Sequence, residues 1–182
     1  ISIQNEPDYD ATWDSCRFDP TENATVAGYN QAFEAVYSEM NARFGASMPK
    51  MLGPECIGLG YNSLNNFLNA IINHSHVYGY AHHLYHGGSG QDPDSYLPEM
   101  QDLNASWGSK PLFQTEYEDR IDGNWPDGYN LALLLHNALT VEQVSGYLYW
   151  DLFWSDPSGL IGFPSYGSSD YILHSDFYGF KH

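Results

Sequence analysis

Positively charged side chains are scarce in this sequence. Six Lys and Arg stand against 23 Asp and Glu, and the formal net charge at pH 7 is -17. Proteins that bind nucleic acid or anionic membranes use clusters of cations to neutralise phosphate groups. The composition therefore argues against nucleic-acid and membrane partners and favours a neutral ligand.

Cysteines and long apolar runs are also few. Cys16 and Cys56 are too few for a disulfide framework, and their neighbours lack the spacing of a zinc site. No apolar run approaches the roughly 20 residues that span a bilayer, and no positively charged leader precedes Ile1. We expect no membrane span and no cofactor.

Aromatic residues make up 16% of the 182 residues, and the hydrophobic content is 42%. This length and hydrophobic fraction are typical of a globular domain with its own core and exclude a disordered chain. The aromatic fraction exceeds what such a core requires. Trp and Tyr combine an apolar face with a polar tip, which suits stacking against hydroxylated sugar rings.

Two apolar patterns alternate along the chain. Steps of three and four residues, such as Tyr29, Phe33 and Val36, predict amphipathic helices. Short apolar segments between them suit buried strands. The helices are expected over 24–44, 62–74, 94–107 and 128–140, and the strands over 1–5, 50–55, 78–85, 110–118 and 146–154. This alternation is typical of a parallel α/β sheet, in which ligands bind at the carboxyl ends of the strands.

Polar and aromatic side chains follow the ends of these expected strands. Such residues are costly in a core unless they face a cleft, and helix caps favour Ser, Thr, Asp and Asn over Glu, Tyr and Trp. We therefore predict a site at this edge of the sheet, against the alternative of capping and loop solvation. Its candidate residues are Asn5, Glu6, Glu55, His83, Tyr85, Glu116, Glu118, Trp150 and Asp151.

Four motifs occur in order along the chain: ISIQNEPDY, AHHLYH, PLFQTEYED and GYLYWDLFW. In this order they closely resemble glycoside hydrolase family 30, and its xylanase subfamilies in particular. The resemblance covers almost the entire chain and implies an α/β fold, the (β/α)8 TIM barrel, present as its five C-terminal strand-helix units. Residues 1–182 would then lack the first three units and the small β side domain of the family.

The resemblance implies that Glu6 matches the general acid/base and Glu116 the nucleophile of a retaining glycosidase, with Asn5 touching the sugar 2-hydroxyl. A retaining mechanism needs two carboxyl groups about 5 to 5.5 Å apart. At that distance and an effective dielectric constant of about 20, the two charges repel by roughly 3 kcal/mol, which favours a proton on Glu6 while Glu116 stays ionised. Glu118 is the rival nucleophile because it falls on the same strand face. We prefer Glu116 because it matches the family motif.

The HHLYH run raises the question of a metal site. In an extended strand His82 and His86 share a face opposite to His83 and Tyr85, so the imidazoles cannot converge on one ion without a bend. We therefore expect no metal. By the family resemblance, His83 and Tyr85 face the cleft, with Tyr85 donating a hydrogen bond to the nucleophile or the bound sugar. Trp150 resembles the aromatic floor under the sugar.

The implied activity is that of an endo-β-1,4-xylanase acting by double displacement. Glucuronoxylan-specific members of the family carry an arginine in the loop after the eighth strand, where it pairs with the acidic branch. Residues 154–160 contain no cation here, and Asp156 would repel such a branch. We therefore predict a xylanase that does not require glucuronate branches.

Two alternatives remain open. One is another family 30 activity, such as a β-1,6-glucanase or a β-glucosidase. The other is a noncatalytic carbohydrate-binding protein, although retention of both Glu6 and Glu116 argues against it because binding needs neither.

In the implied barrel, Cys16 and Cys56 follow adjacent strands, and their loops would lie side by side. A disulfide between them would stabilise the fold by about 3 to 4 kcal/mol through restriction of the unfolded chain. The resemblance further implies a secreted, extracellular enzyme that acts on the polysaccharide xylan and is monomeric when full length. Its signal peptide would be absent from this chain, and the 182-residue chain alone is expected to show little activity.

Overall fold

The computed structural model describes residues 1–12, 15–60, 63–118, 124–155 and 159–182. Helices and strands alternate along most of this length, as the apolar patterns predict. The helices are α1 (Tyr29–Phe44), α2 (Ser63–Ala70), α3 (Leu97–Trp107), α4 (Trp125–Asn137) and α5 (Ser175–Lys181), with the short helical turns η1 (Gly45–Ser47), η2 (His74–His76) and η3 (Pro93–Tyr96) and the π-helical turn η4 (Ala138–Glu142). The strands are β1 (Leu52–Cys56), β2 (Gly79–His83), β3 (Leu112–Glu116), β4 (Gly146–Tyr147), β5 (Phe153–Ser155), β6 (Ile161–Phe163) and β7 (Ile172–Leu173).

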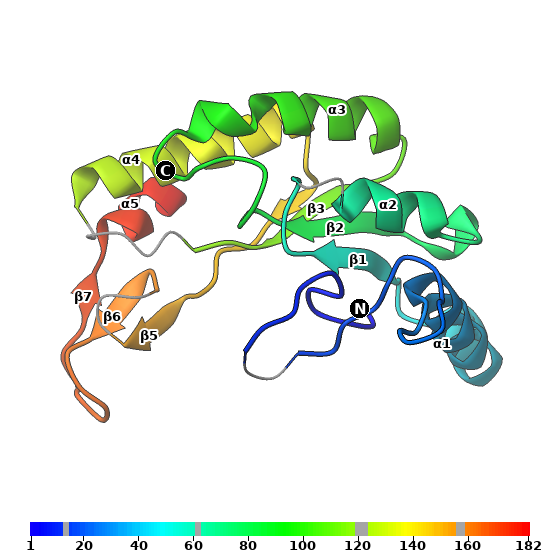
Figure 1. Ribbon diagram of the computed structural model, residues 1–182. Helices are drawn as coiled ribbons and strands as arrows, with labels where there is room; N and C mark the ends of the chain where they lie inside the picture. Colours follow the sequence, from blue (N-terminus) through cyan, green and yellow to red (C-terminus); the bar gives the residue numbers. More distant parts are fainter. Residues whose placement is uncertain (13–14, 61–62, 119–123, 156–158) are drawn as a thin grey trace.

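The first four strands form one parallel sheet in the order β1-β2-β3-β4, and a helix connects each strand to the next. Figure 1 shows α2, α3 and α4 along one side of this sheet and the N-terminal segment on the other. A parallel sheet built in chain order with helical crossovers is the arrangement of part of a TIM barrel. The described strands leave the sheet open and do not close a barrel.

Two β-bulges interrupt the sheet at the carboxyl ends of its strands. The register between β1 and β2 shifts at Glu55, and the register between β2 and β3 shifts at Thr115, so each is an extra residue without a partner in the ladder. Glu55 also has a φ of 65°, in the left-handed region that few residues other than glycine adopt. A bulge re-aims the side chain that it carries. Both bulges lie next to the residues expected in the site.

The hydrophobic core lies between the sheet and the helices. Tyr29 and Phe33 of α1 are buried, and the Tyr29 ring packs on Phe67 of α2 with ring centroids 5.5 Å apart. The predicted apolar stripe of α1 continues past these residues, but Val36 and Phe44 are exposed. Figure 1 shows that this half of the helix extends beyond the sheet. Other core residues are Met51, Cys56, Leu64, Leu68, Tyr80, Leu84, Tyr96, Met100, Leu112 and Leu134.

Residues 1–5 form no strand, so this prediction was wrong. Leu52 donates its N–H to the Ile1 carbonyl at 2.7 Å, and Glu6 donates its N–H to the Glu55 carbonyl at 3.0 Å. The segment therefore runs beside β1 and touches it near both ends, without the regular ladder that defines a strand.

The single strand expected over 146–154 is divided between two sheets. Gly146–Tyr147 forms β4, and Trp150 still donates its N–H to the Tyr117 carbonyl at 2.9 Å beyond the end of β3. Phe153–Ser155 then leaves this sheet as β5 and pairs in the order β5-β6-β7. The sequence pattern missed the division because apolar and aromatic residues continue across it with only Asp151 between them.

Within the described part of the chain, no helix has both the length and the apolar character that crossing a membrane requires.

Candidate active site

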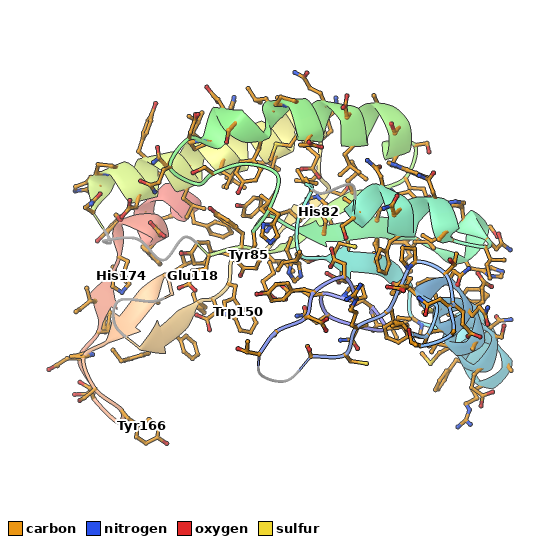
Figure 2. The ribbon with its side chains drawn as sticks, viewed as in Figure 1. His82, Tyr85, Glu118, Trp150, Tyr166 and His174 are labelled. Carbon is orange, nitrogen blue, oxygen red and sulfur yellow. The ribbon has the colours of Figure 1, made fainter. Side chains whose placement is uncertain are left out.

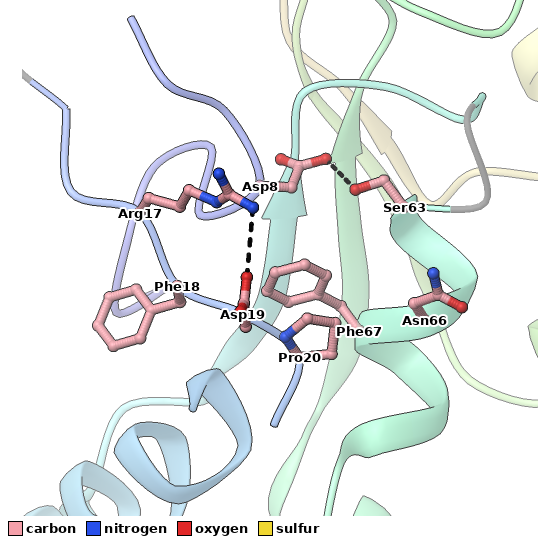
Figure 3. A pocket seen from close by; sticks show the side chains of 8 residues that line it. All are labelled: Asp8, Arg17, Phe18, Asp19, Pro20, Ser63, Asn66 and Phe67. Atoms are coloured by element: carbon pink, nitrogen blue, oxygen red, sulfur yellow. Dashed lines mark hydrogen bonds and ion pairs between the residues drawn. The ribbon is translucent and has the colours of Figure 1, made fainter. Parts of the chain in front are cut away.

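The N-terminal segment delivers Glu6 to the carboxyl end of β1. Glu6 has a φ of 46°, so the chain turns sharply where its N–H meets Glu55. Two residues later, Asp8 anchors the segment, because its carboxylate accepts the Ile57 N–H at 3.0 Å and the Ser63 hydroxyl at 2.5 Å. The Asp8–Ser63 bond, which ties the segment to α2, is drawn in Figure 3.

A small pocket of about 240 Å³ lies beside this anchor (Figure 3). Its lining consists of Asp8, Arg17, Phe18, Asp19, Pro20, Ser63, Asn66 and Phe67. Arg17 pairs there with Asp10 at 3.2 Å and Asp19 at 3.4 Å. Because two aspartates offset its charge, Arg17 is a poor partner for an acidic ligand.

Strand β2 and the residues just after it bring His83 and Tyr85 near Glu6, and β3 brings Glu116. The His83 Nδ1 lies 3.0 Å from Glu6 Oε1, and its Nε2 lies 3.9 Å from Glu116 Oε2. The Tyr85 hydroxyl donates to Glu116 Oε1 at 3.1 Å. Although Glu6 and Glu116 are far apart in the sequence, one oxygen of each carboxyl group and one His83 nitrogen all lie within 4.8 Å of one another. A separation of no more than 4.8 Å between these two oxygens is compatible with a retaining glycosidase, whose two carboxyl groups lie about 5 to 5.5 Å apart.

An open cleft of about 590 Å³ runs over these acids. Its lining includes five of the six residues that the sequence predicts as catalytic or substrate-binding, and Trp150 is 45% exposed along it. Figure 2 shows Tyr85, Glu118 and Trp150 near one another, between the N-terminal segment and the β5-β6-β7 sheet, whereas Tyr166 lies at a distant loop tip. The lining residues are Asn5, Glu6, Tyr9, Ile57, Tyr85, His86, Glu116, Glu118 and Trp150.

His83 is the sixth predicted residue, and it lies beneath the cleft instead of facing it. Its side chain is 1% exposed. Carboxylates face it from three segments of the chain, because Glu55 Oε2 lies 3.6 Å from Nε2 in addition to the contacts with Glu6 and Glu116. The expectation that the side chain of His83 faces the cleft is therefore corrected: it contacts the acids that line the cleft.

Charge and burial set the protonation of this group. Burial by itself lowers the pKa of His83, but hydrogen bonds to Glu55 and Glu6 and the attraction of Glu116 outweigh it and raise the pKa to about 9. Burial raises the pKa of Glu116, and His83 and the Tyr85 hydroxyl oppose that rise. His83 is therefore an imidazolium at neutral pH. Its positive charge offsets the repulsion between Glu6 and Glu116, which the sequence argument treated as two carboxylates alone.

Glu6, His83 and Glu116 are close enough to surround one ion, an arrangement that the HHLYH pattern did not predict. A metal-bound imidazole must offer a free nitrogen lone pair. In His83 both ring nitrogens face carboxylate oxygens, and the raised pKa of His83 keeps both protonated near neutrality. The arrangement therefore favours acid–base chemistry over metal binding.

His82 and His86 take different positions from each other. His82 points away from the cleft to Glu142, with Nε2 2.6 Å from Oε1, as the alternation of β2 predicts. His86 was expected on that same face but lines the cleft, because β2 ends at His83 and the chain bends beyond it.

Glu118 lines the cleft farther from the imidazole than Glu116 does. It is 7% exposed, and its Oε1 accepts the Gly159 N–H at 3.1 Å. Burial, followed by the nearby charge of Glu118, raises the pKa of Asp151. Glu118 therefore belongs to the acidic lining of the cleft, together with Glu6 and Glu116. Of these lining acids, Glu6 at 3.0 Å and Glu116 at 3.9 Å are the ones that contact His83.

The predicted disulfide is not formed, and both cysteines are free thiols. Cys56 is fully buried in the core, whereas Cys16 is exposed in the loop after Glu6. The bridge requires side chains that point toward each other, and these two point into different environments. Asp156, on which the argument about glucuronate branches partly rested, lies outside the described residues.

Sequence reasoning gave no role to Glu55, Tyr9 or Ile57. Glu55 was included among the polar strand-end residues, but it lies outside the four motifs that carry the family resemblance. Its position at a bulge, buried beside His83, is visible only in the structure. Tyr9 follows Glu6 closely, and Ile57 comes directly after β1. Their closeness in sequence to these positions was the signal that could have placed them in the cleft lining.

No protein-family model and no curated protein matches the sequence. Among solved structures, the chain resembles a family 30 endoxylanase from Clostridium papyrosolvens C71, with a TM-score of 0.55 and 22% identity over 88% of this chain and 35% of that protein. It also resembles a family 30 subfamily 8 xylanase from Clostridium acetobutylicum, with a TM-score of 0.57 and 22% identity over 87% and 35% of the two chains.

A third similar structure is the endo-β-1,6-glucanase BT3312, with a TM-score of 0.64 and 14% identity over 98% of this chain and 41% of that protein. This chain spans about a third of the length of the two xylanases that it matches. At these identities the similarities establish a glycosidase-like fold, and function must be argued from the site.

Proposed function

We propose that this chain carries the catalytic acids of a retaining glycosidase whose substrate is xylan. The observation that carries the proposal is the meeting of Glu6 and Glu116, whose carboxyl oxygens lie within 4.8 Å of each other at the edge of one cleft. Two carboxyl groups at this separation suit attack on an anomeric carbon by one and proton transfer by the other.

In the proposed reaction, a Glu116 oxygen attacks the anomeric carbon while Glu6 donates a proton to the departing glycosidic oxygen. The bond between that oxygen and the anomeric carbon breaks, and the sugar is held as an ester of Glu116. Glu6 then takes a proton from water, the water oxygen attacks the anomeric carbon, and Glu116 leaves as a carboxylate. The His83 imidazolium, 3.9 Å from Glu116, stabilises that carboxylate before attack and after release.

The cleft lining supports a neutral sugar chain as substrate. Among the described lining residues three are glutamates and none is Lys or Arg. A uronic acid branch would meet Glu118 without a cation to pair with. We therefore propose that xylan is cleaved without a requirement for glucuronate branches. A polymer of this kind does not cross a membrane, so the proposed enzyme acts outside the cell.

A β-1,6-glucanase activity is the second candidate. The endo-β-1,6-glucanase BT3312 is similar over 98% of this chain and has the higher TM-score of 0.64, whereas the two xylanases have the higher identity of 22%. The fold comparison alone does not rank the two substrates.

The test uses the complete gene product with glucuronate-free xylan, glucuronoxylan, β-1,6-glucan and aryl β-glycosides, with products identified by mass. We expect xylo-oligosaccharides from both xylans. Release of glucose oligomers alone would replace xylan with β-1,6-glucan as the substrate, and cleavage only at a fixed offset from glucuronate would overturn the branch-independent specificity.

The Glu116→Gln variant separates an enzyme from a binding protein. We expect turnover to be lost while xylan binding, measured by isothermal calorimetry, is kept. Glu39→Gln, an exposed residue of α1 paired with Arg43, is the matched control and should behave as the wild type. Full turnover in Glu116→Gln would contradict the assignment of the nucleophile.

A further inference from the structure

A third carboxylate, Glu55, lies at the point where the three segments of the site meet. Its side chain is largely buried, with 8% of the residue exposed, and it does not line the cleft. Burial of a charge is costly unless partners compensate it. Glu55 has such partners on each neighbouring segment.

The first set of contacts joins Glu55 to both sides of the catalytic pair. Its backbone carbonyl accepts the Glu6 N–H at 3.0 Å, which fixes the backbone of the proposed acid/base. Its Oε2 accepts the hydroxyl of Thr115, the residue that precedes the proposed nucleophile Glu116. The same Oε2 lies 3.6 Å from His83 Nε2, so one residue of β1 contacts the N-terminal segment, β2 and β3.

Both ends of the Glu55–Thr115 hydrogen bond are bulge residues. Glu55 is the extra residue of β1 and Thr115 the extra residue of β3, and β2 lies between the two strands. In a regular pleat, neighbouring residues alternate between the two faces of the sheet, and a bulge interrupts that alternation. Two bulges that direct their side chains to each other across a third strand are a specific local arrangement, because each breaks the regular ladder and leaves the extra residue unpaired.

We propose that Glu55 is a positioning residue for the catalytic pair, holding His83 charged and fixing the spacing of Glu6 and Glu116. This inference rests on the proposed function. The pKa of Glu55 is consistent with this role. Burial raises the pKa of Glu55, but hydrogen bonds from His83 and Thr115 outweigh that effect and bring the pKa below its usual value. Glu55 is therefore a carboxylate throughout the neutral range, and it does not itself exchange protons with substrate.

The charged and titratable groups around this cluster come from every adjoining segment. Around Glu55 and His83 they are Glu6 from the N-terminal segment, Tyr29 from α1, Cys56 from β1, His82 from β2, Tyr85 beyond β2, and Glu116 from β3. Among them Glu6, Glu55 and Glu116 carry the negative charge that faces His83, so removing one of the three should lower the pKa of His83 without neutralising it fully.

The test is Glu55→Gln in the complete gene product, with two readouts. The imidazole titration of His83, followed by NMR, should move to lower pH by about 1 unit or more, because an opposite charge within a few ångströms has been removed. The kcat on xylan should fall by up to about 100-fold with KM little changed, because the reacting groups lose their alignment while the cleft walls stay intact.

Two further variants keep the test sharp if Glu55→Gln folds poorly. Thr115→Val removes the hydroxyl that orients Glu55 and leaves its charge, so it should lower kcat with a smaller shift of the His83 titration. Glu55→Asp keeps the charge on a shorter side chain and should restore part of the His83 shift. Glu34→Gln is the matched control, because it also removes a glutamate paired with a histidine, His76 at 2.7 Å, but outside the cleft lining.

The outcomes separate this inference from the proposed function. If the wild type hydrolyses no glycoside, the proposed function fails, and the His83 titration still reports whether Glu55 holds the imidazolium. If the wild type is active and Glu55→Gln changes neither the His83 titration nor kcat, Glu55 is not a positioning residue. A lower kcat accompanied by the same loss in Glu34→Gln would also overturn the inference, since it would indicate a general loss of stability.

Discussion

Two adjacent histidines on β2 face opposite sides of the sheet, and their surroundings differ in the number of carboxylates and in access to the cleft. His82 meets one carboxylate, Glu142, and both side chains are almost fully enclosed. His83 meets three carboxylates, and two of them, Glu6 and Glu116, reach an open cleft. The enclosed His82–Glu142 pair can affect only the stability of the fold. A charged imidazole next to solvent-accessible acids, such as His83, can also influence proton transfer.

On the helix side of β2, both ring nitrogens of His82 have a hydrogen-bond partner. His82 Nδ1 lies 2.8 Å from the His83 carbonyl, and Glu142 outweighs the effect of burial to raise the pKa of His82. The π-helical turn η4 delivers Glu142 to this position. The comparison thus predicts that substitutions of the acids that line the cleft change turnover, and that substitutions on the helix side change stability alone.

Glu6→Gln should have the largest effect on the cleft side. It removes the proposed proton donor, so kcat on xylan should fall by about 100- to 10,000-fold, the usual contribution of general acid–base catalysis. The free energy of unfolding should change little, and steady-state kinetics together with urea denaturation measure both. Aryl glycosides with good leaving groups should lose less in the first step. An equal loss on every substrate would point to a misplaced site and weaken the assignment.

Glu142→Ala should have the largest effect on the helix side. It leaves His82 buried without its carboxylate, and breaking such a pair costs about 3 to 5 kcal/mol of unfolding free energy. Chemical denaturation of the complete gene product measures this loss. Glu39→Ala, at an exposed ion pair, is the control and should lose under about 1 kcal/mol. If Glu142→Ala proved as stable as that control, the helix-side pair would have no structural role.

Alkaline pH should weaken the cleft side through His83. The pKa of His83 is raised to about 9, above the ordinary value of about 6.5. The charged His83 therefore contributes its full stabilisation of the folded state below about pH 6.5, and this contribution is lost as the pH rises through about 9. The expected loss of unfolding free energy is about 3 kcal/mol. The measurement is the unfolding free energy against pH for the wild type and His83→Gln. Parallel curves for the two proteins over this window would show that His83 does not titrate there.

Tyr85→Phe should give the smallest change. It removes the hydroxyl that donates to Glu116 at 3.1 Å, one of the contacts that restrain the rise in the pKa of Glu116. We expect about a tenfold loss in kcat/KM, equivalent to about 1.4 kcal/mol, and an acid limb of the pH profile that moves to higher pH. A limb that stays in place, or moves to lower pH, would contradict the role of this hydrogen bond.

The sequence was sufficient for features that repeat or that end an element. The spacing of Tyr29 and Phe33 predicted α1, and the alternation of apolar segments predicted the parallel order of β1 to β4. The pairing of Glu6 with Glu116 came from the family resemblance, and the strand expected before Glu6 is absent: Glu116 ends β3, whereas Glu6 reaches the same edge on a segment that forms no strand.

What the sequence could not predict depended on irregular backbone. Glu55 lacked a role because a bulge is invisible to a pattern of period two, and the separation of β4 from β5 occurs within a continuous apolar run. The prediction of a disulfide between Cys16 and Cys56 was wrong. The order of strands in the implied barrel indicates which loops are neighbours, but it does not determine where each side chain points.

The paired bulges have a consequence for how this site changes between generations of a gene. Loss of the single codon for Glu55 or for Thr115 would return that strand to a regular pleat, and the residues that follow would keep their partners on β2, Cys56 with His82 and Glu116 with His83. One three-base deletion would therefore remove one end of the Glu55–Thr115 hydrogen bond while leaving Glu116 opposite His83.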